Sequence, residues 1–201
     1  MELAKSHTGF HIFAFEPTPE LVEKISSNMM SQFRNMKPKN FTIVPMAVGE
    51  SEGIARFHVN GMGDWGCSSL RQMKSDATNI SGREKIGITQ EIDIRVVRLD
   101  TFCREHDIRL IGFLHVDAQG ADLSNLKSLG PYLSCVQAGV LEASTSAESS
   151  SYVTDNTIQN VSCFLRDNGF EITPIMPNNA FYDEVNIHFR NPMFKPLGTP
   201  S

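Results

Sequence analysis

The sequence contains no long apolar run and no cluster of basic residues. No segment approaches the roughly 18 apolar residues that indicate a membrane-spanning helix, and the N-terminal segment, MELAKSHTGF, lacks the apolar core of a signal peptide. The formal net charge is −5 at pH 7 and no run of Lys or Arg occurs, which argues against binding of nucleic acid or of anionic lipid. These absences predict a cytoplasmic protein that binds neither nucleic acid nor membranes.

Cysteine is also scarce. The four cysteines, at positions 67, 103, 135 and 163 of the 201 residues, form no C-x-x-C pair. That spacing argues against a zinc site and against a disulfide framework, and no His and Asp cluster has the spacing of metal ligands. We therefore expect no resident metal ion.

The chain does contain a regular alternation of short apolar strands and helical patterns, which is typical of an α/β domain with a largely parallel sheet. The apolar runs that suggest buried strands lie at 12–15, 41–48, 112–116 and 136–141. The length and the lack of a linker predict a single domain over residues 1–190 and a C-terminal tail at 191–201.

Several segments constrain the order of the strands. Pro45 cannot donate a hydrogen bond to a neighbouring strand, so the strand around it is expected to lie at an edge of the sheet or to end at this proline. The segment Ile54–Val59 alternates apolar and polar residues and is expected to form an antiparallel strand. The last two strands are predicted at 170–175 and 182–189, joined by a turn at 177–179.

The segment His11–Glu20, HIFAFEPTPE, carries the first functional signal. A short apolar strand ends at Glu16 and Pro17, and a helical pattern follows. The second strand of a nucleotide-binding sheet looks like this, because a carboxylate at its carboxyl end can accept hydrogen bonds from both ribose hydroxyls. The ten residues before it contain one glycine, Gly9, and no glycine-rich cofactor loop.

Five segments in order resemble the FkbM-type S-adenosylmethionine-dependent methyltransferases. They are FAFEP at 13–17, IVPMAVGESEGIARFHV at 43–59, CSSL at 67–70, RLDTFCREHDI at 98–108 and FLHVDAQGADLSNLKSLG at 113–130. The resemblance implies a Rossmann-like class I methyltransferase sheet with strand order 3-2-1-4-5-7-6, mostly parallel with an antiparallel last strand. It also implies S-adenosyl-L-methionine as the cofactor and methyl transfer to an oxygen of a sugar or small metabolite, the acceptor partner.

The chain departs from the family pattern at its N-terminal end. The family's first strand and its D-x-G-A-N-x-G turn should precede FAFEP, whereas Glu2–His7 resembles the end of the helix that follows that turn. We therefore expect an N-terminally truncated domain. If the chain is complete, it should bind S-adenosylmethionine weakly or not at all. An in-frame D-x-G-A-N-x-G sequence upstream of Met1 would instead identify an internal start.

Five residues are expected to contact the cofactor. The resemblance implies that Glu16 binds the ribose and that Met46 and Ala47 lie beside the adenine, where the small Ala47 side chain leaves room for the ring. Ser69, in a glycine-rich loop, is expected to contact the cofactor or the substrate. Asp117, after a buried strand, is expected to contact the methionine part of the cofactor or the substrate. The alternative for Glu16 is an acid favoured by the dipole of a helix N-terminus, and for Met46 and Ala47 it is ordinary strand core.

Two acids at the ends of successive strands are the expected catalytic residues. Asp117 comes directly after a buried run, at the mouth where ligands bind in such sheets, and Glu142 ends the next strand. Two carboxyl groups at adjacent strand ends can serve a substrate hydroxyl, one of them as general base. The alternatives are a turn aspartate and a loop acid beside the Ser- and Thr-rich segment 143–156, which is predicted as a lid-like or mobile loop.

Two other functions fit parts of the pattern. The chain could be a methyltransferase-like remnant or binding module that has lost the cofactor glycine loop and its activity. A nicotinamide-dependent oxidoreductase also uses an acid after its second strand, but the chain contains no G-x-G-x-x-G turn after a buried strand.

Overall fold

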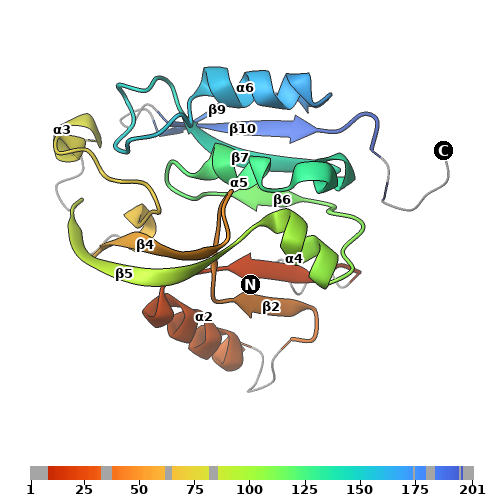
Figure 1. Ribbon diagram of the computed structural model, residues 1–201, viewed down its shortest axis with the longest axis horizontal. Coiled ribbons are helices and arrows are strands. Elements are labelled where there is room, and N and C mark those ends of the chain that lie inside the picture. The colour runs from red at the N-terminus through yellow and green to blue at the C-terminus, as the bar shows by residue number, and fades with distance from the viewer. Residues whose placement is uncertain are drawn as a thin grey trace.

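The fold is an α/β arrangement of mixed sheets with helices packed on them (Figure 1). The computed structural model describes residues 9–32, 38–61, 65–81, 86–173, 175–179, 184–194 and 196. The predicted helix end at Glu2–His7 lies outside these described residues.

The first sheet pairs β1 (Ile12–Phe15) with β2 (Phe41–Val44) in parallel, joined by helix α2 (Pro19–Gln32). Pro19 suits the first helical position because it has no N–H to satisfy there. The Thr18 carbonyl accepts hydrogen bonds from the amides of Leu21 and Val22 at 3.1 and 3.0 Å. Strand β2 stops before Pro45 and, among the described residues, pairs only with β1, so the edge position predicted from this proline is confirmed.

The second sheet has the order β6-β7-β10-β8, with β9 also pairing β10. Its strands are β6 (Leu114–Val116), β7 (Ala138–Ser144), β8 (Glu171–Ile172), β9 (Met176–Asn179) and β10 (Glu184–Arg190). Strand β6 runs parallel to β7, whereas β10 is antiparallel to its three partners, which confirms the antiparallel last strand. The predicted turn at 177–179 is wrong, because these residues belong to β9 and pair with β10.

The third sheet has the order β3-β5-β4, built from β3 (Ala47–Val48), β4 (Gly53–Asn60) and β5 (Ile88–Val97). The antiparallel strand predicted at Ile54–Val59 lies within β4, which pairs antiparallel with β5. Exposed polar side chains of β5 pair with those of β4 across the two strands. Nε of Arg56 lies 3.8 Å from Oε2 of Glu91 and 3.5 Å from Oδ1 of Asp93. Short helical segments, η1 (Trp65–Cys67) and α3 (Ala77–Ser81), lie between the two strands in sequence.

Four helical segments pack near the second sheet. They are α4 (Leu99–Glu105), α5 (Asp122–Lys127), η2 (Gly130–Cys135) and α6 (Ile158–Asp167). The helical spacing of Leu123, Leu126, Leu129 and Leu133 predicts one helix over 122–133, but the chain turns at Gly130, where φ is +49°. A Cβ atom at this position would lie 2.9 Å from Oδ2 of Asp100, so a larger residue would crowd that carboxylate.

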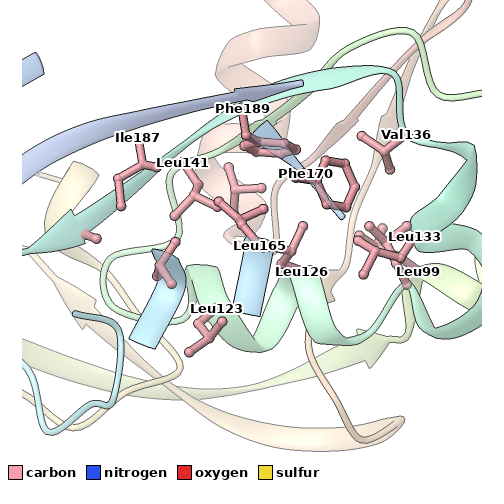
Figure 2. Packing of buried hydrophobic residues seen from close by; sticks show 14 of the residues in the cluster. Leu99, Leu123, Leu126, Leu133, Val136, Leu141, Leu165, Phe170, Ile187 and Phe189 are labelled. Carbon is pink, nitrogen blue, oxygen red and sulfur yellow. The ribbon is translucent and has the colours of Figure 1, made fainter. Parts of the chain in front are cut away.

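The main hydrophobic core lies between the second sheet and helices α5 and α6 (Figure 2). Leu126, Leu141, Leu165 and Ile187 are each 0% exposed. The rings of Phe170 and Phe189 pack edge to face, with centroids 5.3 Å apart. This core joins the strands β7 and β10 to the helices that pack on them.

The continuous Rossmann-like sheet predicted from the resemblance is not formed by the described residues. Within that part of the chain, β1 is hydrogen-bonded only to β2 and β6 only to β7, so β1 and β6 are not paired with each other. In the view of Figure 1, β2, β1, β6, β7 and β10 follow one another across the molecule. Side-chain packing links the two sheets instead, since Phe15 of β1 packs against the main core and against the cluster that contains Phe102 of α4.

Candidate functional site

The turn after β6 forms the centre of the candidate site. Gln119 and Gly120 have φ values of +50° and +85°, a left-handed pair of residues that reverses the chain between β6 and α5. The side-chain amide nitrogen of Gln119, Nε2, donates to Oδ1 of Asp117 at 2.8 Å and to Oε2 of Glu142 at 3.4 Å. The structure thus brings the two acids predicted as catalytic within reach of one amide nitrogen.

The two acids differ in their surroundings. Asp117 is exposed after the end of β6, whereas Glu142 is only 8% exposed and pairs in register with Asn186 of β10. The prediction that Glu142 ends its strand is wrong, because β7 continues to Ser144. Antiparallel pairing with β10 extends the strand beyond the acid, and this partner lies far away in sequence.

Asp122, the first residue of α5, is a further acid of the site that the sequence does not single out. It is fully buried, and its oxygens accept hydrogen bonds from the Ala118 amide and the Asn156 side chain, both at 3.2 Å. Burial raises the pKa of Asp122 to about 7, and the charge of Asp117 adds to this effect. An acid at the start of a helix is the one signal in the sequence, but it does not reveal burial.

Asn156 ties the Ser- and Thr-rich segment 143–156 to the site. Its amide donates to the Glu142 carbonyl at 2.9 Å, and its Oδ1 accepts the Leu123 amide at 3.0 Å. At the other side of the segment, the Lys74 ammonium donates to the Ala147 carbonyl at 2.6 Å. Hydrogen bonds therefore hold the segment predicted as a lid-like or mobile loop both at its end, through Asn156, and within it, at Ala147.

The segment after η1 borders the same turn. The Ser69 hydroxyl donates to the Gln119 carbonyl at 2.7 Å and accepts the Arg71 amide at 2.9 Å. The Tyr152 hydroxyl lies 2.7 Å from the Cys67 carbonyl and 3.2 Å from Oε1 of Gln119. Ser69 is 1% exposed, so in this structure its hydroxyl links two segments of the site. Its predicted cofactor contact stays a prediction.

Glu16 stands directly after β1, where the sequence places it. Its Oε1 accepts the Thr18 amide at 2.7 Å, and its backbone amide donates to the Val44 carbonyl at 3.0 Å. The side chain thus helps to begin α2, which is the structural role weighed for it. Within the described residues its other carboxylate oxygen has no hydrogen-bond partner, so ribose binding stays a prediction.

Met46 and Ala47 lie at the passage from β2 to β3. Met46 is partly buried against the cluster that contains Phe102, whereas Ala47 is 6% exposed within the cluster of the third sheet. Together with Glu16 they form a second group of predicted cofactor residues at the ends of β1 and β2. No hydrogen bond in the described part of the chain joins this group to Asp117.

The described residues lack what a membrane-spanning helix and a metal site require. Among the described helices, none is long and apolar enough to cross a membrane. Across the same part of the chain, no group of three or more His, Cys, Asp or Glu side chains could hold a metal ion.

Comparison with known proteins indicates one family. Residues 2–172 match the model of the methyltransferase FkbM domain. No curated protein and no solved structure matches the chain. Because the matched region covers most of the sequence and contains the Asp117 turn and Glu142, the chain belongs to the FkbM methyltransferase domain family.

Proposed function

We propose that the chain is an S-adenosylmethionine-dependent methyltransferase that methylates a hydroxyl oxygen of a sugar or of another small metabolite. The observation that carries this proposal is the pair of carboxylates, Asp117 and Glu142, held by the Gln119 amide beside the end of β6. Membership of the FkbM family supports methyl transfer as the reaction class.

The chemistry of the predicted cofactor residues fits S-adenosylmethionine. One carboxylate oxygen of Glu16 is available to accept hydrogen bonds from ribose hydroxyls at the end of β1. Met46 offers a partly buried apolar side chain beside that strand end, which suits an adenine face. The exposed carboxylate of Asp117 suits an ammonium group, because charge-assisted hydrogen bonds to carboxylates are strong.

When bound, S-adenosylmethionine supplies a methyl group on a sulfonium whose leaving group is a neutral thioether. The chain must therefore align the acceptor oxygen and take its proton. In our proposal Asp117, the more exposed of the two acids, accepts the proton of the acceptor hydroxyl as general base. Gln119 gives one N–H to each carboxylate and so fixes their orientation, while Glu142 anchors the amide from within β7.

Binding can be tested on the full chain by calorimetry with S-adenosylmethionine. We expect Glu16→Gln to weaken the affinity, because a neutral amide is a poorer acceptor for two ribose hydroxyls. The matched control is Glu105→Gln, which changes an exposed acid in the last turn of α4. Binding of a nicotinamide cofactor in place of S-adenosylmethionine would refute the proposal.

Catalysis can be tested by transfer of a labelled methyl group to a panel of monosaccharides and small hydroxylated metabolites. Loss of a positioned general base typically lowers the rate by about 10²–10⁴-fold, so we expect Asp117→Asn to show a loss of that size when S-adenosylmethionine is saturating and weaker cofactor binding does not limit the rate. If Asp117→Asn retains full activity on an accepted substrate, the assigned base is wrong.

A further inference from the structure

Arg71 has an unsatisfied donor next to the candidate site. Of the arginines in the described residues, two are partly buried, Arg71 and Arg98. Arg98 forms a two-point ion pair with Asp100, at 2.9 Å through Nε and 2.6 Å through Nη2. The Nε–H of Arg71 is buried and has no hydrogen-bond partner. Buried donors without an acceptor are rare and costly in native proteins.

The backbone around Arg71 is held against the site from two sides. Its amide donates to the Ser69 hydroxyl, which in turn donates to the Gln119 carbonyl. The next carbonyl, that of Gln72, accepts the Val153 amide at 2.9 Å. Arg71 thus belongs to a segment fixed between the turn that carries Asp117 and the segment that carries Tyr152.

The other cation of this segment has a different role. Lys74 donates to the carbonyls of Ala147 and Glu148, at 2.6 and 3.3 Å, and so fastens the Ser-rich segment. The structure gives Arg71 no ion pair with a carboxylate of the described residues, although a guanidinium is a planar fork of five donors that matches carboxylate and phosphate. An arginine that has an unsatisfied donor, and whose segment is hydrogen-bonded through Ser69 to the turn that carries Asp117, suits an anionic ligand.

We propose that Arg71 binds an anionic group, a carboxylate or a phosphate, on the methyl acceptor. The assignment of the anion to the acceptor rests on the proposed function, whereas anion binding by Arg71 does not. The acceptor would then carry both the hydroxyl that meets Asp117 and a negative charge that meets Arg71. The cofactor also carries a carboxylate, so the experiment must separate these two sources.

The first test measures thermal unfolding of the full chain in titrations of inorganic phosphate and of acetate at constant ionic strength. We expect the midpoint of the wild-type chain to rise with phosphate or acetate, since a ligand that binds the folded state stabilises it. Arg71→Met should abolish the rise, and Arg71→Lys should weaken it because the planar fork of donors is replaced by a single ammonium. The control is Arg95→Met, an exposed arginine of β5, which should keep the full rise.

The stability of Arg71→Met without anions distinguishes anion binding by Arg71 from a purely structural role. In buffer without phosphate or carboxylate, Arg71→Met should unfold at the same or a higher temperature than the wild type, because it removes an unsatisfied buried donor. A clear fall in the midpoint would overturn the proposal in favour of a structural guanidinium. A wild-type chain that does not respond to either anion would overturn it as well.

The second test identifies the source of the anion by calorimetry with S-adenosylmethionine. If the anion belongs to the acceptor, Arg71→Met should change the cofactor affinity by less than about twofold while it abolishes the phosphate response. Removal of a charge-assisted hydrogen bond to the cofactor would instead weaken its binding by about tenfold or more, and a change of that size would overturn the acceptor assignment. Absence of cofactor binding in the wild type would count against the proposed function and would leave the phosphate test of Arg71 unaffected.

Discussion

Replacement of Asp122 by asparagine should change how the stability of the chain depends on pH. The carboxyl group is fully buried, and its hydrogen-bond donors, Ala118 and Asn156, favour the ionised form. Desolvation outweighs them and raises the pKa of Asp122 from 3.8 to about 7, with a smaller contribution from the charge of Asp117. Asp122→Asn keeps the size of the side chain and removes this titration.

The sign of the effect follows from the direction of the pKa change. Between pH 3.8 and about 7 the unfolded chain has released a proton that the folded chain still holds, so the folded state loses stability as the pH rises. At about 1.36 kcal/mol per pKa unit, the wild type loses roughly 4 kcal/mol from this group by about pH 8. Asparagine avoids that loss, but its amide nitrogen cannot accept from Asn156, a pH-independent cost of about 1–3 kcal/mol.

Urea denaturation of both proteins at several pH values between about 4 and 8 measures the difference. We expect Asp122→Asn to be the less stable protein at the acid end and the more stable one at the alkaline end, with a crossing between. The control is Asp76→Asn, at an exposed position, which should show no such crossing. Parallel stability profiles for the wild type and Asp122→Asn would refute the reasoning, because Asp122 would then titrate normally in the folded state.

Three further substitutions test the packing and the turn geometry. Leu126→Ala, in the 0% exposed core position of α5, should lower the free energy of unfolding by about 2–5 kcal/mol in urea denaturation. Gly130→Ala should cost about 1–2 kcal/mol in the same assay, because φ is +49° there and a Cβ would crowd Asp100. Asn156→Ala should speed hydrogen exchange at the Leu123 amide, whose acceptor it removes; unchanged exchange would show that the segment is held by other contacts.

Local patterns predict those elements whose signals lie within the element itself. Strand β1 and helix α2 follow from an apolar run, a proline and helical spacing, and β4 follows from the alternation of apolar and polar residues. The turn at Gly130 has a local signal, because a glycine followed by Pro131 commonly ends a helix, whereas its close approach to Asp100 depends on a residue elsewhere in the sequence. Strand β9 escapes prediction for the same reason, since its proline and asparagines suggest a turn until β10 is there to pair with them.

The candidate site shows the same division between local and distant causes. The closeness of Asp117 and Glu142 was predictable, because each acid lies near the carboxyl end of one of two neighbouring parallel strands. Their link through Gln119 was not, since it depends on the left-handed conformation of that residue. The burial of Asp122 and its contact with Asn156 depend on how the Ser-rich segment folds back, which no spacing in the sequence indicates.

The predicted cofactor residues at the ends of β1 and β2 are separate from Asp117, and aromatic packing joins β1 to helix α4. Phe13 and Phe15 of β1 both meet Phe102 of α4 edge to face, with centroids 5.2 and 4.9 Å apart. Such pairs contribute about 0.5–1.5 kcal/mol each, so Phe102→Leu should lower stability and also displace Glu16 relative to Asp117. We therefore expect Phe102→Leu to weaken S-adenosylmethionine binding while the phosphate response of Arg71 persists. A stability loss with unchanged cofactor affinity would show that this packing does not position the cofactor residues.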